Sequence, residues 1–471
     1  MKKLDRREFL KRVGAAGAVV GATVALDSCT GGAGTGAVSG VITGGNNGTG
    51  EKPIGPMTHR TNRRGDDQVS LLGYGCMRWP TVSRSKVQPD GNDIDQEQVN
   101  RLVDYAIEHG VNYFDASPVY CKGFCEKATG IALSRHPRES YYIATKLSNF
   151  AESLQSREAG IRMFQNSLRE LQVDYIDYYL LHSVGGGGMA NFSKRYLDNG
   201  MLDYCMEQRE KGVIRNLGFS FHGDVEVFNW LLANDDKYHW DFVQIQMNYV
   251  DWLHAEEQSR NNVNAVYLYG ELQKRGIPAV IMEPLLGGRL SKLPVHVQNH
   301  LKERRPDMSV ASWAFRFCGT YPGVMTVLSG MTYMEHLQDN LRSFCPLDAL
   351  TDEDLAYLEE TANNILTYPT VPCNDCNYCM PCPYGINIPA IFVHYNKLVN
   401  EGVVPKDAED PDYRELRRKY LISFDRAVPA IRQADHCIGC NQCSSHCPQN
   451  IRIPQQLRRI AKRIEDLRQN L

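Results

Sequence analysis

The feature that most constrains the fold is an alternation of short apolar segments and longer amphipathic segments between about residues 70 and 345. The short segments are rich in β-branched and aromatic residues, as buried strands are, whereas the longer ones have helical periodicity. Eight strands alternating with helices predict a (β/α)8 TIM barrel of the α/β class. The competing fold is an open doubly wound sheet, but no G-x-G-x-x-G turn follows the first strand. The expected strands are Leu71–Met77, Asn112–Asp115, Tyr141–Lys146, Tyr175–His182, Ile214–Ser220, Phe242–Gln246, Ala279–Met282 and Val324–Ser329.

After Phe344 this alternation stops, and two cysteine runs follow, CNDCNYCMPCP from Cys373 and CIGCNQCSSHCP from Cys437. Disulfides, zinc and an iron–sulfur cluster are the three candidate explanations. Disulfides confined to two tight loops would leave most of the chain without a cross-link. Zinc sites place a longer loop between their two C-x2-C pairs. The spacing favours iron–sulfur clusters, because C-x2-C-x2-C presents three thiolates and a remote Cys-Pro supplies a fourth.

An internal repeat links the two runs, since Cys382-Pro-Tyr-Gly-Ile-Asn-Ile-Pro389 matches Cys447-Pro-Gln-Asn-Ile-Arg-Ile-Pro454. Gly385 and Asn450 take the same place in the two copies, and both residue types tolerate a positive φ. We therefore expect the same turn in each copy. The second run has one more residue before its last cysteine than the first.

The second run resembles the C-x2-C-x2-C-x3-C-P signature of two-cluster ferredoxins. This resemblance implies two [4Fe-4S] clusters, each completed by a cysteine of the other run. The long and mostly helical segment between the runs implies an α-helical ferredoxin-like domain. Iron–sulfur centres carry one electron each, so the domain is expected to transport single electrons. The implied ligand sets are Cys373, Cys376, Cys379 and Cys447 for one cluster, and Cys437, Cys440, Cys443 and Cys382 for the other.

The N-terminal segment MKKLDRREFLKR, followed by an apolar run from Val13 to Leu26, resembles a bacterial twin-arginine (Tat) signal. The run ends in Leu-Asp-Ser-Cys29, which resembles a lipobox. We expect a signal peptide over residues 1–29, a Gly/Thr/Ser-rich flexible linker over 30–60, and an exported protein that is periplasmic or anchored to the membrane of a bacterium by a lipid. The net charge of −3 leaves no basic excess for nucleic acid.

Four polar side chains lie at the ends of predicted strands or in the loop that follows: Asp115, Tyr120, Lys146 and His182. In a (β/α)8 barrel all four would face the C-terminal mouth, where active sites lie. An ammonium beside a phenol favours the phenolate, so Lys146 is expected to lower the pKa of Tyr120 while Asp115 holds the lysine charged. His182 would direct a substrate carbonyl toward Tyr120. The four residues therefore predict a proton-delivery unit.

These residues belong to the motifs YFDASPVY, ATKLS and LLHS, which together with LGYGCMRWP and EPLLGGRL resemble the aldo-keto reductases over about residues 60–345. The cysteine runs match a branch of that family with a C-terminal ferredoxin module. The implied domains are a barrel over 61–345 and a di-[4Fe-4S] domain over 346–471. The family implies hydride transfer from NAD(P)H to a carbonyl, with Tyr120 as the acid. It also implies cofactor contacts at Ser220, Gln246, Gly330 and Asn340, although Met282 replaces the aromatic residue that usually stacks on nicotinamide.

The resulting hypothesis is an exported oxidoreductase that couples carbonyl or alcohol chemistry in the barrel to electron transfer through two clusters. It predicts a small-molecule carbonyl or alcohol substrate, and a redox partner protein or membrane electron carrier. Nicotinamide bound before export and recycled in place is the expected hydride source, and entry of electrons through the clusters is the other route. Two alternatives are an electron-transfer iron–sulfur protein whose barrel is a non-catalytic scaffold, and a non-redox binding lipoprotein whose clusters are structural.

Overall fold

The computed structural model describes residues 54–82, 93–259, 262–405, 409 and 411–469. The predicted signal peptide, the lipobox and most of the predicted linker lie outside these residues. None of the described helices is both long and apolar enough to cross a membrane.

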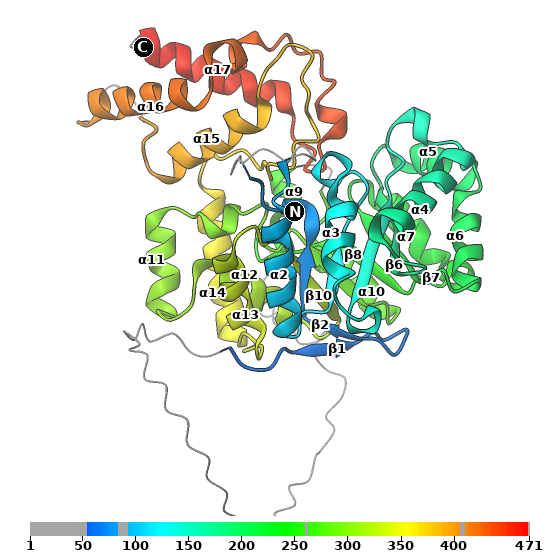
Figure 1. The fold of residues 1–471 in the computed structure, drawn as a ribbon. Coiled ribbons are helices and arrows are strands. Elements are labelled where there is room, and N and C mark those ends of the chain that lie inside the picture. Colours follow the sequence, from blue (N-terminus) through cyan, green and yellow to red (C-terminus); the bar gives the residue numbers. More distant parts are fainter. Residues whose placement is uncertain (1–53, 83–92, 260–261, 406–408, 410, 470–471) are drawn as a thin grey trace, which may run out of the picture. The chain divides into compact units, whose positions relative to one another are not determined.

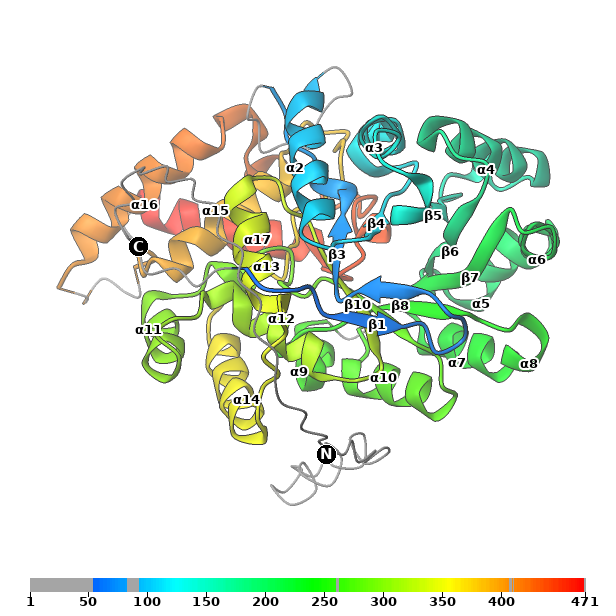
Figure 2. The ribbon, with the colours of Figure 1, turned by 60° about the horizontal axis from the view of Figure 1, so that its bottom comes forward.

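Eight parallel strands close into a barrel in the order β10-β3-β4-β5-β6-β7-β8-β9, which confirms the predicted fold (Figures 1 and 2). The strands are buried along nearly their whole length because helices cover the outside and side chains fill the inside. Every predicted strand is present, with ends that differ by a few residues. The bounds are β3 Leu72–Gly75, β4 Tyr113–Asp115, β5 Tyr142–Leu147, β6 Ile176–Val184, β7 Ile214–Phe221, β8 Phe242–Gln246, β9 Ala279–Met282 and β10 Val324–Ser329.

Several helices around the barrel start at polar side chains that cap them. Asp95 accepts a hydrogen bond from the backbone N–H of Gln98, and Ser309 accepts one from the backbone N–H of Ser312, so each side chain caps the first turn of the helix that follows it. The bounds are α2 Gln96–Glu108, α3 Cys125–Leu133, α4 Arg157–Leu171, α5 Gly188–Phe192, α6 Met201–Glu210, α7 Val225–Ala233, α8 Asp235–Tyr238, α9 Asp251–Gln258, α10 Ala265–Lys274, α11 Val295–Arg304, α12 Val310–Thr320 and α13 Met334–Phe344.

A short antiparallel hairpin, β1 (His59–Thr61) and β2 (Gln68–Ser70), precedes the barrel and was not predicted (Figure 2). Val69 of β2 belongs to the barrel core, where it packs with side chains from the interior faces of the strands, Tyr113 and Tyr178 among them. The hairpin therefore fills one end of the barrel, and the site described below lies at the other.

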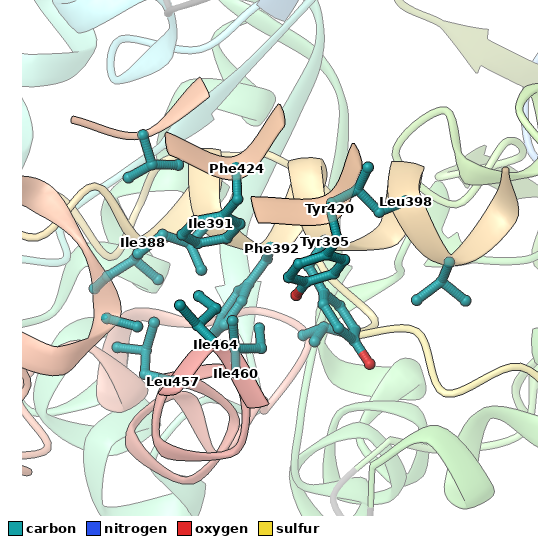
Figure 3. Close-up of a cluster of buried hydrophobic side chains, with 14 of the residues drawn as sticks. Ile388, Ile391, Phe392, Tyr395, Leu398, Tyr420, Phe424, Leu457, Ile460 and Ile464 are labelled. Carbon is teal, nitrogen blue, oxygen red and sulfur yellow. The ribbon is translucent and has the colours of Figure 1, made fainter. Parts of the chain in front are cut away.

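Four helices complete the described chain: α14 Asp352–Leu366, α15 Ile388–Asn400, α16 Tyr413–Ala427 and α17 Ile453–Gln469. The first of these is bonded to the barrel, because the Tyr357 hydroxyl donates to the carbonyl of His300 in α11. The last three helices enclose an apolar core (Figure 3). Its members include Ile391 of α15, Phe424 of α16 and Leu457 of α17. We call the segment from residue 367 to the end of α17 the cysteine module.

Both copies of the internal repeat make the predicted turn. Gly385 has φ of 76° and Asn450 has φ of 51°. In each copy the amide of this residue donates to the carbonyl of the cysteine three positions earlier, Cys382 or Cys447, at 3.0 Å. The repeat is therefore structural as well as sequential.

Candidate active site

The four predicted catalytic side chains converge at the C-terminal mouth of the barrel. Asp115 ends β4, Lys146 is the next-to-last residue of β5, and His182 lies near the end of β6. Tyr120 opens the 3-10 turn that follows β4. All four side chains are buried, with the Tyr120 residue the most exposed at 8%.

Lys146 and Asp115 form a buried ion pair at the base of the site. The ammonium Nζ of Lys146 lies 2.5 Å from Asp115 Oδ1 and 2.8 Å from the carbonyl oxygen of Ala116. The other carboxylate oxygen, Oδ2, is buried and has no hydrogen-bond partner among the described residues. Burial raises the pKa of Asp115, and the charge of Lys146 opposes this rise. Because both charges are buried away from water, each one is compensated mainly by the other.

The predicted lowering of the Tyr120 pKa is wrong for this arrangement. Lys146 Nζ lies 4.9 Å from the centroid of the Tyr120 ring, but burial raises the pKa of Tyr120 well above its ordinary value, and the charge of Asp115 adds to the rise. The carboxylate offsets the ammonium that was expected to favour the phenolate. Tyr120 is thus a phenol that keeps its proton until a substrate oxygen gains negative charge, as a general acid for carbonyl reduction requires.

His182 is held in a fixed orientation by a residue that the sequence analysis missed. Its Nδ1 lies 2.6 Å from Ser148 Oγ, and that hydroxyl lies 3.0 Å from Ser117 Oγ. Burial lowers the pKa of His182 well below its ordinary value, and the charges of Lys146 and Arg195 add to this. The imidazole is therefore neutral, and Nε2 is the nitrogen left to face a substrate oxygen. Ser148 is the final residue of the motif ATKLS, so the signal was present in the sequence.

The cysteine module contacts the same mouth of the barrel. In the loop from Cys373 to Pro383, the carbonyl of Asn374 accepts a hydrogen bond of 2.9 Å from Arg78, which follows β3. Tyr378 of this loop lies close enough to the site for its phenol to contribute to the raised pKa of Tyr120, after burial and Asp115. The loop that carries the first cysteines therefore adjoins the predicted proton donor.

Cys447 joins the three cysteines of the first run around one hollow. Cys373, Cys376, Cys379 and Cys447 line a small hollow together with apolar side chains such as Phe392. Burial raises the pKa of Cys376, and the neighbouring Cys447, Cys373 and Cys379 contribute to the rise. A group of four thiols with a cavity between them suits a [4Fe-4S] cluster, which the sequence assigned to these four residues. We call this the inner cluster site.

The other three cysteines of the second run form a second group. Burial raises the pKa of Cys443, and Cys437 and Cys440 contribute to the rise, so these three thiols are neighbours. Cys382 packs against the same apolar core as Cys437 and Cys443, and its role as their fourth ligand stays a prediction. Within the described residues, no three His, Cys, Asp or Glu side chains are placed to hold a single metal ion. We call the second set the outer cluster site.

The residues expected to hold NAD(P)H are already engaged by protein groups. Ser220 Oγ accepts a hydrogen bond from the backbone of Ser183 at 2.8 Å. Gln246 pairs with Gln449 of the cysteine module through two hydrogen bonds, of 2.9 and 3.2 Å. Asn340 donates to Ser329 Oγ at 2.9 Å. In this arrangement a nicotinamide carboxamide could pair with Gln246 only by displacing Gln449.

Gly330, at the far end of the expected cofactor site, also lies beside protein groups. Gly330 directly follows β10 and is exposed, and a Cβ at this position would contact the side chain of Arg78. Arg289, in the loop after β9, donates to Gln258 at 3.0 Å and to Thr370 at 3.2 Å. Arg289 therefore links the barrel to the start of the cysteine module.

Comparison with known proteins gives two family matches. Residues 71–363 match the Aldo/keto reductase family, and residues 372–452 match the 4Fe-4S dicluster domain. The first match ends within α14, and the predicted domain boundary at residue 346 stays a prediction. The sequence is 24% identical over 322 residues to the uncharacterized oxidoreductase YqkF of Bacillus subtilis, covering 64% of this chain and 96% of that one.

Two further proteins are similar to the barrel part of this chain. The L-galactose dehydrogenase of Arabidopsis thaliana is 22% identical over 327 residues, which cover 64% of this chain and 94% of the plant protein. The aldo-keto reductase AKR11C1 of Bacillus halodurans, in its holo form, superposes with a TM-score of 0.50 at 24% identity, covering 65% of this chain and 96% of that one. These alignments cover about two thirds of this chain.

Proposed function

This chain belongs to the aldo/keto reductase family and carries a 4Fe-4S dicluster domain, and from that premise we propose that it couples carbonyl or alcohol chemistry to single-electron transfer. The substrate is a small molecule that binds at Tyr120 and His182. The overall conversion joins a carbonyl, two electrons and two protons to give an alcohol, or runs in reverse. We further propose export by the Tat route and anchoring through Cys29.

The observation that carries the proposal is the position of the cysteine loop beside the proton donor. The buried pair of Lys146 and Asp115 lies beneath Tyr120, and Tyr378 of the cysteine loop lies near enough to Asp115 for that carboxylate to add to the rise that burial causes in the pKa of Tyr378. A reaction at Tyr120 would therefore occur next to the inner cluster site. In the reducing direction Tyr120 gives one proton to the substrate oxygen, and His182 orients that oxygen.

The outer cluster site is where an external electron carrier would dock. Cys440 is exposed, whereas the cysteines of the first run are only partly so. The neighbouring Ile438 is 64% exposed, and a large apolar side chain in that position is available for contact with a partner. A redox protein or a membrane electron carrier that exchanges single electrons fits this placement.

The test uses full-length protein purified without oxygen, with iron and sulfide counted and any released nucleotide identified. Reduced methyl viologen serves as the electron donor and a panel of aromatic and aliphatic aldehydes as the acceptor. Coupled chemistry predicts that Tyr120→Phe and Cys440→Ser each abolish aldehyde-dependent oxidation of the dye. If Tyr120→Phe is fully active while Cys440→Ser is inactive, the barrel is a scaffold and the proposal fails.

A further inference from the structure

The side-chain amide of Gln246 has no N–H group left for a cofactor. Its Nε2 donates to Asp251 at 2.7 Å and to Gln449 at 3.2 Å, and its Oε1 accepts from Gln449 Nε2 at 2.9 Å. A primary amide has two N–H donors, and both are used here. Gln449 is buried, with 3% of its surface exposed. The pair is thus a closed and desolvated contact between the end of β8 and the cysteine module.

A nicotinamide carboxamide is able to form the same reciprocal amide pair with Gln246. Both groups are primary amides that offer one carbonyl oxygen and two N–H donors. Gln449 therefore presents to the barrel the same functional group as the cofactor, in the same two-bond pairing. Only Pro448 lies between it and Cys447, which lines the inner cluster site.

Neighbouring contacts hold the module in this position. The Ser259 hydroxyl, just after α9, donates to the carbonyl of Asn450 at 3.1 Å. Gly287, in the loop after β9, lies so near the cysteine loop that a Cβ on it would come within 2.4 Å of the Asn374 Cα. Gly287 also has φ of 68°, which favours glycine. The loop after β9 and the cysteine loop are therefore packed backbone to backbone beside the site.

We propose that Gln449 occupies the nicotinamide carboxamide subsite of the barrel, so that the inner cluster takes the place of NAD(P)H as the immediate redox partner of the substrate. This inference rests on the proposed function for the identity of the reaction. In alcohol oxidation the O–H and C–H bonds of the substrate break, and two protons are released to solvent. Clusters held by the cysteines of the inner and outer sites would each take one of the two electrons, and two equivalents of an external one-electron acceptor would receive them.

The test is nicotinamide binding to the full chain with its clusters loaded, measured by titration with NADPH and NADH under nitrogen. Wild-type protein is expected to show no saturable binding. Gln449→Ala removes the competing amide, and Gln449→Asn shortens it, so both are expected to bind at least about tenfold tighter than wild type. Gln442→Ala is the matched control, because Gln442 is an exposed glutamine between Cys440 and Cys443. Equal iron and sulfide content shows that the variants keep their clusters.

Two results would overturn the inference. One is saturable binding of NADPH or NADH to wild-type protein. The other is that neither Gln449 variant binds more tightly than the Gln442→Ala control. A separate arm mixes dithionite-reduced wild-type protein with the aldehyde panel. Loss of reduced-cluster signal there supports the proposed function whatever the nicotinamide result. No loss of signal defeats the proposed function, while the binding result still decides the role of Gln449.

Discussion

Replacing Lys146 by methionine tests how the site is held together. The substitution keeps most of the side-chain volume but removes the only cation bonded to Asp115 among the described residues. The carboxylate is 2% exposed and its Oδ2 already has no hydrogen-bond partner. Removing one partner of a buried ion pair typically costs about 3–5 kcal/mol, since the other charge is left without compensation. We expect Lys146→Met to lower the free energy of unfolding by that amount at neutral pH.

The double variant with Asp115→Asn separates this charge effect from a loss of packing. With both charges removed, no isolated carboxylate remains, so the double variant should recover most of the lost stability. The coupling in the double-mutant cycle should exceed about 2 kcal/mol. Urea unfolding can be followed by tryptophan fluorescence, because all five tryptophans lie in the barrel part of the chain. A loss below about 1 kcal/mol in Lys146→Met, or no recovery in the double variant, would refute the reasoning.

The same variant has a predictable dependence on pH. Burial already raises the pKa of Asp115 in the folded protein, and Lys146 opposes the rise. Without the lysine the folded pKa rises further above its unfolded value. A group with a raised folded pKa contributes stability below its unfolded pKa and loses it as pH increases toward the folded pKa. The deficit of Lys146→Met should therefore be smaller at about pH 5 than at about pH 8.

Three further predictions concern neighbouring groups. Ser148→Ala frees Nδ1 of His182 and should lower kcat about tenfold with little change in aldehyde KM, and Ser148→Thr should restore part of the loss. Burial raises the pKa of Glu126 from 4.5 to about 7, so above neutral pH the ionised carboxylate lowers the free energy of unfolding by up to about 3 kcal/mol. Glu126→Gln should therefore raise the urea midpoint at about pH 8 and leave it nearly unchanged at about pH 4. Cys447→Ser should lose the inner cluster signal in electron paramagnetic resonance while the outer one persists, and loss of both or neither would contradict the ligand assignment.

The barrel could be predicted from the sequence because its strands are short runs of mostly apolar residues. The segment YYLLHS in β6 is apolar on both faces, as a strand covered inside and outside must be, and its last polar residues mark the mouth. That rule placed His182 and Lys146 correctly at strand ends. The hairpin of β1 and β2 escaped detection because strands of three residues carry no readable period.

Contacts between distant segments could not be predicted in the same way. Gln449 follows Cys-Pro in the repeat, and nothing in its local sequence indicates that it meets Gln246 on β8. The raised pKa of Tyr120 could not be predicted from the sequence either. Its causes are burial and the nearby charge of Asp115, and both arise only when the side chains are packed. The positive φ of Gly385 and Asn450, by contrast, followed directly from the residue types in the repeat.

The most direct test of coupling between barrel and clusters is the fate of electrons already stored in the protein. Clusters are reduced with dithionite, the excess reductant is removed, an aldehyde is added, and freeze-quenched samples are followed by electron paramagnetic resonance. We predict that the reduced-cluster signal decays in wild-type protein with alcohol formed in proportion, and persists in Tyr120→Phe. Decay at the same rate in both proteins, or no decay in either, would contradict the account.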